Sequence, residues 1–198
     1  MIELEIGILI AIITAIVGPI LVEKYKKYLN RNKDSEFVEA IKANAVIGDE
    51  LENLQLSLNA DRVWISQFHN GGNFYTTGKS IQKISITYEF VKPKQQGIRD
   101  IFKNIPVSLF HKSIMKLYES GEIILPSYNV KNDYGLRSFA ENLGAKSSYI
   151  FALKSLKGDF IGSIGIEWCS RRRLLNKVDI ETLKNKSVSI GGLLGTTL

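Results

Sequence analysis

The distribution of hydrophobic and polar residues sets a short amino-terminal stretch apart from the rest of the chain. Residues 6–22 read IGILIAIITAIVGPILV and contain no charged side chain. A helix of this length reaches about 25 Å, the short end of what crosses a hydrocarbon core. A helix buried in a soluble core normally keeps a polar side, and Thr14 is the only polar side chain here. We therefore interpret residues 6–22 as a transmembrane helix.

Charged residues flank this run unequally. Two acidic residues lie in the short tail of residues 1–5, and basic residues follow the run closely, namely Lys24, Lys26, Lys27, Arg31 and Lys33. Because basic flanks resist translocation, we expect a single-pass membrane protein whose carboxy-terminal domain is cytoplasmic. Residues 23–34 then form a basic juxtamembrane linker that contacts the anionic surface of the lipid bilayer, although the same residues also suit a solvated helix end.

The next segment has helical spacing. Asp34 or Ser35 is suited to capping a helix that runs to about residue 60, within a domain spanning residues 35–198. Four apolar residues on this helix are spaced by four, three and four positions: Ile47, Leu51, Leu54 and Leu58. Such a seam fits the domain's own sheet or the same helix of a second subunit equally well, so a homodimer or higher homo-oligomer is expected if the second use applies.

The remaining chain changes repeatedly between extended and helical periodicity. Residues 62–68 and 80–91 alternate as two paired strands, with the turn-forming HNGGN after the first. There follow a helix at 107–119, a strand at 122–125, a short helix at 134–143, a hairpin at 148–153 and 160–168, and a closing helix that Asn176 caps. An antiparallel sheet with helices packed on one face, the α+β class, accommodates this order.

Composition and charge remove several classes of function. The formal net charge is +6, but the longest basic run is Arg171 to Arg173, so we expect no specific nucleic-acid binding. One cysteine, Cys169, and two histidines exclude a disulfide scaffold and the common zinc sites. The sequence has no nucleophile elbow, phosphate-binding loop or His-Glu-x-x-His helix. We therefore expect a protein that is not an enzyme and needs no cofactor.

Candidate ligand-binding residues lie near the ends of the predicted strands. His69 and Asn70 follow the first strand, and Tyr88 and Glu89 close the second, where antiparallel pairing would bring one of them toward His69 and orient its ring. These residues equally suit a plain turn or a buried structural pair.

A second polar group precedes the predicted helix at 134–143. It contains Tyr134 and Arg137, and the planar guanidinium of Arg137 suits a carboxylate or phosphate. Ordinary turn chemistry is the alternative for this group.

The last third of the chain resembles a known sensor fold. The stretch YIFALKSLKGDFIGSIGIEW, followed by NKVDIETLKNKSVSIGGLL, resembles the last hairpin and terminal helix of GAF domains, and the order of elements is similar over about residues 36–196. This resemblance implies a small-molecule site over the open face of the sheet and pairing through terminal helices. Cys169 follows the last strand, away from the pocket cysteine that tetrapyrrole-binding members need for covalent attachment.

Two functional hypotheses follow. The first is a membrane-anchored cytoplasmic GAF-like sensor or binding module that recognises a small ligand or protein partner without catalysis. The alternative arises because the same carboxy-terminal stretch is similar to the soluble domain of T-type phage holins. In that case the chain is a holin-like membrane-permeabilising protein whose soluble domain controls assembly.

Overall fold

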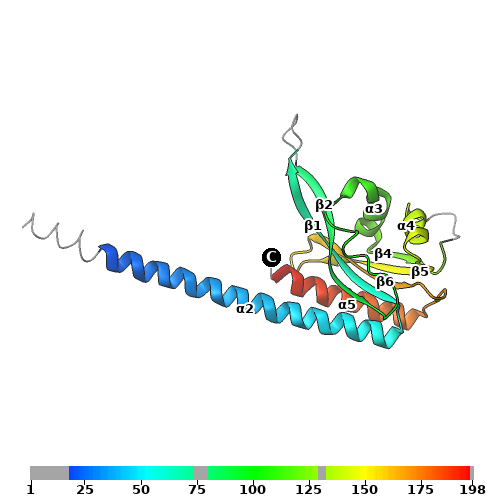
Figure 1. The fold of residues 1–198 in the computed structure, drawn as a ribbon, viewed down its shortest axis with the longest axis horizontal. Helices are drawn as coiled ribbons and strands as arrows, with labels where there is room; N and C mark the ends of the chain where they lie inside the picture. Colours follow the sequence, from blue (N-terminus) through cyan, green and yellow to red (C-terminus); the bar gives the residue numbers. More distant parts are fainter. Residues whose placement is uncertain (1–17, 74–79, 129–132, 197–198) are drawn as a thin grey trace, which may run out of the picture. The chain divides into compact units, whose positions relative to one another are not determined.

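The chain contains one long helix that belongs to two compact units. The computed structural model describes residues 18–73, 80–128 and 133–196, and the chain divides into the units Met1–Ala43 and Asn44–Leu198. Helix α2 (Gly18–Leu58) is continuous (Figure 1). We expected a linker at residues 23–34 and a helix start at Asp34 or Ser35, but the helix runs through both, because residues 20–47 contain no proline or glycine to interrupt it.

Within the first unit, α2 exposes both apolar and basic side chains. Tyr25, Phe37 and Ile41 are among the exposed apolar residues, and Lys24, Lys26, Lys27 are exposed beside them. Arg31 and Lys33 belong to α2, but their side chains are outside the described residues. Of the predicted membrane span at 6–22, only residues 18–22 are described. No helix in the described part of the chain has a stretch long and apolar enough to cross a membrane.

The second unit is built on a six-stranded sheet in the order β3-β2-β1-β6-β5-β4, in which every neighbouring pair is antiparallel. The strands are β1 (Arg62–Asn73), β2 (Ser80–Val91), β3 (Ile105–Pro106), β4 (Glu122–Leu125), β5 (Ser147–Lys154) and β6 (Phe160–Trp168). The predicted β5–β6 hairpin and the short strand β4 are confirmed. The pairing of β1 with β6 places the first and last strands at the centre of the sheet.

One face of the sheet packs against the end of α2 and the closing helix α5 (Lys177–Thr196). Ile47, Leu51 and Leu54 of α2 are buried there with Val63 and Ile65 of β1. The apolar seam that had two possible uses in the sequence therefore faces the domain's own sheet. The Asn176 side chain accepts a hydrogen bond from the backbone N–H of Asp179, which confirms the predicted cap of α5.

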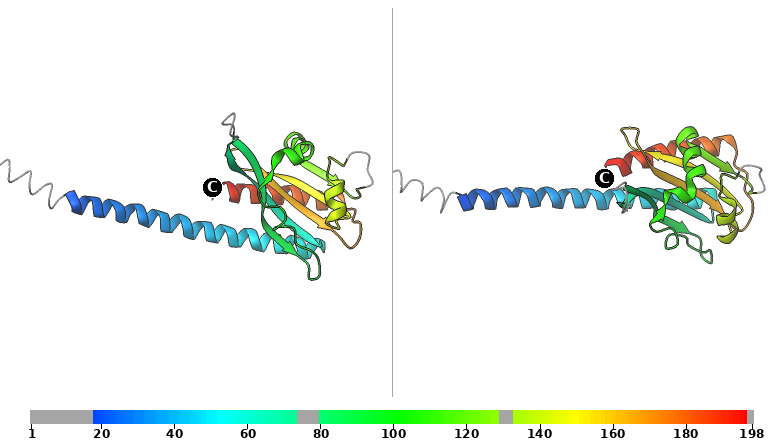
Figure 2. Two further views of the ribbon diagram at one scale, coloured as in Figure 1. Left: turned by 45° about the horizontal axis from the view of Figure 1, so that its top comes forward. Right: turned by 90° about the horizontal axis from the view of Figure 1, so that it is seen from above.

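Further helices cover the opposite face, which corrects the expectation that helices pack on one face only. They are the 3₁₀ turn η2 (Val107–Phe110), α3 (His111–Ser120) and α4 (Arg137–Asn142). A second core joins Leu117 of α3 and Ala140 of α4 to Ile150 of β5. The helices α3 and α4 lie on one side of the sheet and α5 lies on the other (Figure 1, Figure 2). The one-face prediction failed because the apolar spacing of a short helix shows which side of that helix is buried but not which face of the sheet it packs against.

Candidate functional site

A cavity of about 100 Å³ lies between the sheet and the helices α3 and α4. Its floor comes from residues of β1, β2, β5 and β6, and its walls come from the loop before β3, from η2, and from α3 and α4. The lining is mainly aliphatic and aromatic, with a small number of polar side chains. This composition is typical of sites that bind small molecules, where apolar area supplies affinity and the polar groups fix orientation.

Glycines on β6 leave the space that the floor side chains occupy. Trp64 on β1 pairs with Gly165 on β6, and a Cβ added at Gly165 would lie 2.2 Å from Cζ2 of Trp64. The indole therefore lies directly over the backbone of β6, where any larger residue would displace it. Gly162 lies even closer to the backbone of β1, because an added Cβ would be 2.0 Å from the carbonyl oxygen of Ser66.

Three phenylalanine rings from separate segments meet over the cavity. Phe102 comes from the loop before β3, Phe110 from η2 and Phe139 from α4. The ring centroids of Phe110 and Phe139 are 4.7 Å apart, and those of Phe102 lie 5.9 Å from Phe110 and 6.2 Å from Phe139. These distances are within the range of favourable aromatic contact. The three rings form a continuous aromatic wall opposite the sheet.

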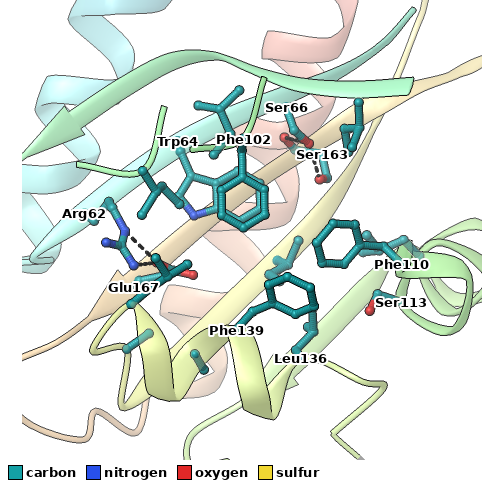
Figure 3. Close-up of a pocket in the computed structure, with 18 of the residues that line it drawn as sticks. Arg62, Trp64, Ser66, Phe102, Phe110, Ser113, Leu136, Phe139, Ser163 and Glu167 are labelled. Atoms are coloured by element: carbon teal, nitrogen blue, oxygen red, sulfur yellow. Dashed lines mark hydrogen bonds and ion pairs between the residues drawn. The ribbon is translucent and has the colours of Figure 1, made fainter. Parts of the chain in front are cut away.

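A buried ion pair forms the polar end of the cavity. Nε of Arg62 donates to Oε2 of Glu167 at 2.7 Å, and one terminal nitrogen donates to the same oxygen at 2.5 Å. The other terminal nitrogen donates to the carbonyl of Gln96 at 2.9 Å. Arg62 is only 1% exposed. Figure 3 shows this pair on one side of the cavity, with Phe110 on the other side and Trp64, Phe102 and Phe139 between them (Figure 3).

Hydroxyl groups continue this polar network. Ser148 donates to Oε1 of Glu167 at 3.1 Å, and Tyr128 donates to the Ser148 hydroxyl at 2.6 Å. Burial alone would lower the pKa of Arg62, but the carboxylate of Glu167 outweighs burial and raises it. For Tyr128, burial is the main cause of a raised pKa. Arg62 is therefore protonated beside Glu167, and Tyr128 keeps its proton as a donor.

The two residues proposed after the first strand lie within it, because β1 continues to Asn73. Nε2 of His69 is 2.8 Å from the hydroxyl of Ser85, which does line the cavity. Asn70 is exposed, and its side-chain oxygen accepts hydrogen bonds from Ser80 and Gln82 on β2. His69 therefore contacts the cavity residue Ser85 without lining the cavity itself. Asn70 links β1 to β2.

Tyr88 and Glu89 do not approach His69, which corrects the expected pairing. The register places Tyr88 opposite Ile65 and Glu89 opposite Trp64, whereas His69 lies opposite Lys83. The expectation failed because, in an antiparallel pair, the end of the second strand lies beside the start of the first strand and not beside its end.

These two residues have separate surroundings. Tyr88 packs with the core on the α2 side and donates to the side-chain oxygen of Asn44. The carboxylate of Glu89 accepts backbone N–H groups from Ile98 at 2.6 Å and Arg99 at 3.1 Å, and so fixes the loop that carries Phe102.

Tyr134 and Arg137 support the cavity wall from the outside. The carbonyl of Tyr134 accepts a hydrogen bond from Ser113, a lining residue of α3, at 2.8 Å. Nε of Arg137 donates to the carbonyl of Tyr128 at 2.9 Å and lies 3.2 Å from a carboxylate oxygen of Asp133. A shallow depression surrounds Arg137, but it is separate from the cavity between sheet and helices.

The residues that line the cavity were not singled out in the sequence, although a signal was present. Arg62 directly precedes the apolar residues VWI, and Glu167 interrupts the apolar run IGIEW. A charged residue inside a strand that is apolar on both faces normally needs a buried partner. Two such residues of opposite charge on separate strands indicate a pair, provided that the strands are known to be neighbours.

The described residues offer neither a metal site nor a cysteine in the cavity. No group of three His, Cys, Asp or Glu side chains in the described part of the chain lies close enough to hold a metal ion. Cys169 follows β6, is half-buried and does not line the cavity. Burial raises the pKa of its thiol, which disfavours the reactive thiolate.

Comparison with known proteins finds the fold among solved structures only. No protein-family model matches the chain, and no curated protein matches it. A far-red cyanobacteriochrome photoreceptor is 11% identical with a TM-score of 0.60, covering 86% of this chain and 95% of that one. The Thermosynechococcus elongatus PixJ GAF domain, in its blue-light-absorbing form, is 12% identical with a TM-score of 0.62, covering 80% and 88%.

A third similar structure is the phycocyanobilin-bound GAF domain of a cyanobacterial phytochrome. It is 13% identical with a TM-score of 0.60, and the match covers 82% of this chain and 94% of that one. Together these likenesses show that the second unit has a GAF-like fold, an antiparallel six-stranded sheet with helices. This confirms the resemblance inferred from the sequence at the level of fold.

Proposed function

We propose that this chain is a non-catalytic sensor module whose GAF-like domain binds a small molecule in the cavity between the sheet and helices α3 and α4. The cavity itself carries the proposal, because it combines a mainly apolar lining with a buried, hydrogen-bonded ion pair at one end. A buried ion pair contributes little to stability compared with apolar residues of the same volume. Its position beside a cavity therefore fits recognition of a ligand.

The similar structures support a bound small molecule without identifying it. The phytochrome GAF domain is phycocyanobilin-bound, and another similar structure contains biliverdin. In this chain the cavity measures about 100 Å³, whereas pockets for drug-sized ligands span about 300–1,000 Å³. The chain's single cysteine also lies outside the lining. The proposed ligand is accordingly a compact molecule that binds without a covalent bond to cysteine.

The test is a ligand screen with a filled cavity as its control. Full-length protein in detergent micelles is screened by NMR against a library of one-ring and two-ring compounds. Ala140→Leu places a larger side chain in the cavity, and Ala45→Leu makes the same change at an exposed position of α2. We expect compounds that bind the natural protein and Ala45→Leu but not Ala140→Leu. A screen without any such compound would contradict the proposed function.

Anchoring by residues 6–22, with the domain in the cytoplasm and subunits paired, is the finer part of the proposal. The uncharged run and the basic residues that follow it support the anchor and its orientation, whereas pairing of subunits rests only on the resemblance to GAF domains. Cysteines introduced at position 2 and in place of Asn53, which is exposed on α2, are labelled in a Cys169→Ser background, in intact cells, with a membrane-impermeant reagent. We expect labelling at position 2 only. Labelling at position 53 would exclude a cytoplasmic domain.

The permeabilising alternative has its own measurement. Expression of the chain with and without residues 1–22 is followed by the membrane potential of the cells. The sensor proposal expects the potential to persist in both cases. Collapse of the potential that requires residues 1–22 would favour the holin-like alternative.

A further inference from the structure

Trp64 supplies a hydrogen-bond donor that the described protein residues leave unpaired. Its Nε1 atom is buried, and none of the described residues accepts its proton. Trp64 also lines the cavity. Figure 3 draws the indole nitrogen on the edge of the ring nearer the Arg62–Glu167 pair (Figure 3). A buried donor without an acceptor destabilises the folded state, so this arrangement needs an explanation.

The position of this donor is fixed by the sheet. The indole lies over Gly165, where an added Cβ would be 2.2–2.8 Å from three of its carbon atoms. The ring is therefore held between β6 and the aromatic wall of the cavity. A neighbouring protein carbonyl is not available, because the β1 and β6 backbones are paired with each other along this stretch. An acceptor for Nε1 has to come from whatever enters the cavity.

Arg62 adds donors at the same end. A guanidinium has five N–H groups, and three of them are engaged with Glu167 and the carbonyl of Gln96. The described residues provide no acceptor for the other two. Because Glu167 neutralises Arg62, this end of the cavity offers several donors but no net positive charge. An uncharged acceptor suits it, whereas a carboxylate would be repelled by Glu167 and would lose its hydration.

The size of the cavity and the aromatic wall restrict the rest of the ligand. An apolar cavity of about 150 Å³ binds benzene in another protein, so a volume of about 100 Å³ admits one ring after a modest outward shift of the lining. Phe102, Phe110 and Phe139 present ring faces and edges to it. A flat ring gains aromatic contacts there that a branched aliphatic group does not.

We propose that the ligand is an uncharged, single-ring aromatic molecule with a carbonyl-type acceptor, which accepts a hydrogen bond from Nε1 of Trp64. This inference rests on the proposed function of the cavity and specifies its ligand class. The ring packs against the three phenylalanines, and the carbonyl oxygen points to the end that contains Trp64 and Arg62.

Three compounds of equal size test the ligand class. Acetophenone carries the carbonyl, α-methylstyrene replaces its oxygen by a methylene, and benzoate replaces the methyl ketone by a carboxylate. Dissociation constants are measured by NMR titration of the full-length protein in detergent micelles, and the free concentration of each compound is corrected for its partitioning into protein-free micelles. We expect acetophenone to bind about tenfold more tightly than α-methylstyrene, as one additional buried hydrogen bond implies, and benzoate to bind most weakly.

Variants at the two tryptophans test the residue. Trp64→Phe removes the indole N–H, and Trp168→Phe makes the same change on the opposite face of the sheet, where Trp168 packs against Tyr149. We expect the preference for acetophenone to disappear in Trp64→Phe and to persist in Trp168→Phe. In the natural protein, the Trp64 indole N–H resonance should move downfield with acetophenone and much less with α-methylstyrene.

The possible failures are separable. If the library screen yields cavity ligands but α-methylstyrene or benzoate binds as tightly as acetophenone, the ligand class is wrong and the proposed function stands. A preference that survives Trp64→Phe overturns the role of Trp64. If the library screen yields no cavity ligand, the proposed function itself is wrong, and this inference fails with it.

Discussion

At the scale of single residues, the cavity depends on side chains that stabilise the fold poorly. Arg62 and Glu167 are both buried and charged. Two apolar residues of similar volume would be about as stable or more stable in the same place. The stability of the sheet therefore depends on both residues being present, and Arg62 offers hydrogen-bond donors to the cavity.

Replacing one member of the pair should be costly, and replacing both should not. Arg62→Met leaves Glu167 buried without its cation, so we expect a loss of about 3–5 kcal/mol in the free energy of unfolding. The double variant Arg62→Met, Glu167→Leu should recover most of this loss. Urea unfolding followed by circular dichroism measures both. Lys103→Met, at an exposed ion pair with Asp100, is the control and should have no measurable effect. Additive losses in the double variant would contradict this account.

Gly165 should be needed for the cavity more than for the sheet. In Gly165→Ala the new Cβ would meet the Trp64 ring, which is a side chain and can move into the cavity. We expect a loss of about 1–3 kcal/mol together with reduced ligand binding. Gly162→Ala would meet the backbone oxygen of Ser66 instead, so its loss should be larger. Thermal unfolding ranks the two, and equal losses would show that the Trp64 ring does not yield.

At the scale of elements, one carboxylate joins the start of β1 to the end of β6. Oδ2 of Asp61 accepts backbone N–H groups from Cys169 and Ser170, each at 2.7 Å. Burial alone would raise the pKa of Asp61, but these two hydrogen bonds, with help from Lys92, outweigh burial and lower it. The ionised form is therefore the one that the folded state prefers.

This shift predicts a dependence of stability on pH. A carboxyl with a lowered folded-state pKa contributes stability above its unfolded pKa of about 3.9 and loses that contribution as pH falls below it. The natural protein should lose stability more steeply below about pH 4 than Asp61→Asn does. Asp49→Asn, at an exposed position of α2, should retain the steep loss. Unfolding free energies measured from pH 2.5 to pH 6 test this, and parallel curves for the three proteins would refute it.

Most elements followed from local patterns, whereas the cavity did not. The β5–β6 hairpin and the Asn176 cap of α5 depend on neighbours in sequence, and both are confirmed. The length of β1 was missed because HNGGN resembles a turn, although pairing with β2 keeps it extended to Asn73.

The polar end of the cavity depends on strands far apart in sequence. Arg62 and Glu167 are 105 residues apart and meet only because β1 pairs with β6. No periodicity in a single segment reveals that pairing, so the sequence could not place the cavity.

At the scale of the whole molecule, the boundary between the two units predicts what can be removed. Deleting residues 1–43 leaves Ile47 in place, which is the first buried residue among the described side chains of α2. We expect the remaining fragment to unfold cooperatively with the stability of the full-length chain. Deleting residues 1–58 also removes Ile47, Leu51 and Leu54, whose burial is worth roughly 5–9 kcal/mol, comparable to the whole stability of a typical domain.

Circular dichroism and urea unfolding compare the two deletions. We expect the fragment from residue 44 to be folded and the fragment from residue 59 to be unfolded. An unfolded fragment from residue 44 would show that the domain boundary lies earlier in α2.

Adjacent residues of the central strand serve opposite sides of the sheet. On β1, Val63 and Ile65 belong to the core beneath α2 and α5, whereas Trp64 and Ser66 line the cavity. Residues that face the proposed ligand site and residues that hold the end of α2 are thus interleaved along one strand. Substitutions at Trp64 and Ser66 therefore offer evolution, or a protein engineer, a route to a new specificity that leaves the core beneath α2 and α5 unchanged, whereas Arg62 on the same face has to change together with Glu167.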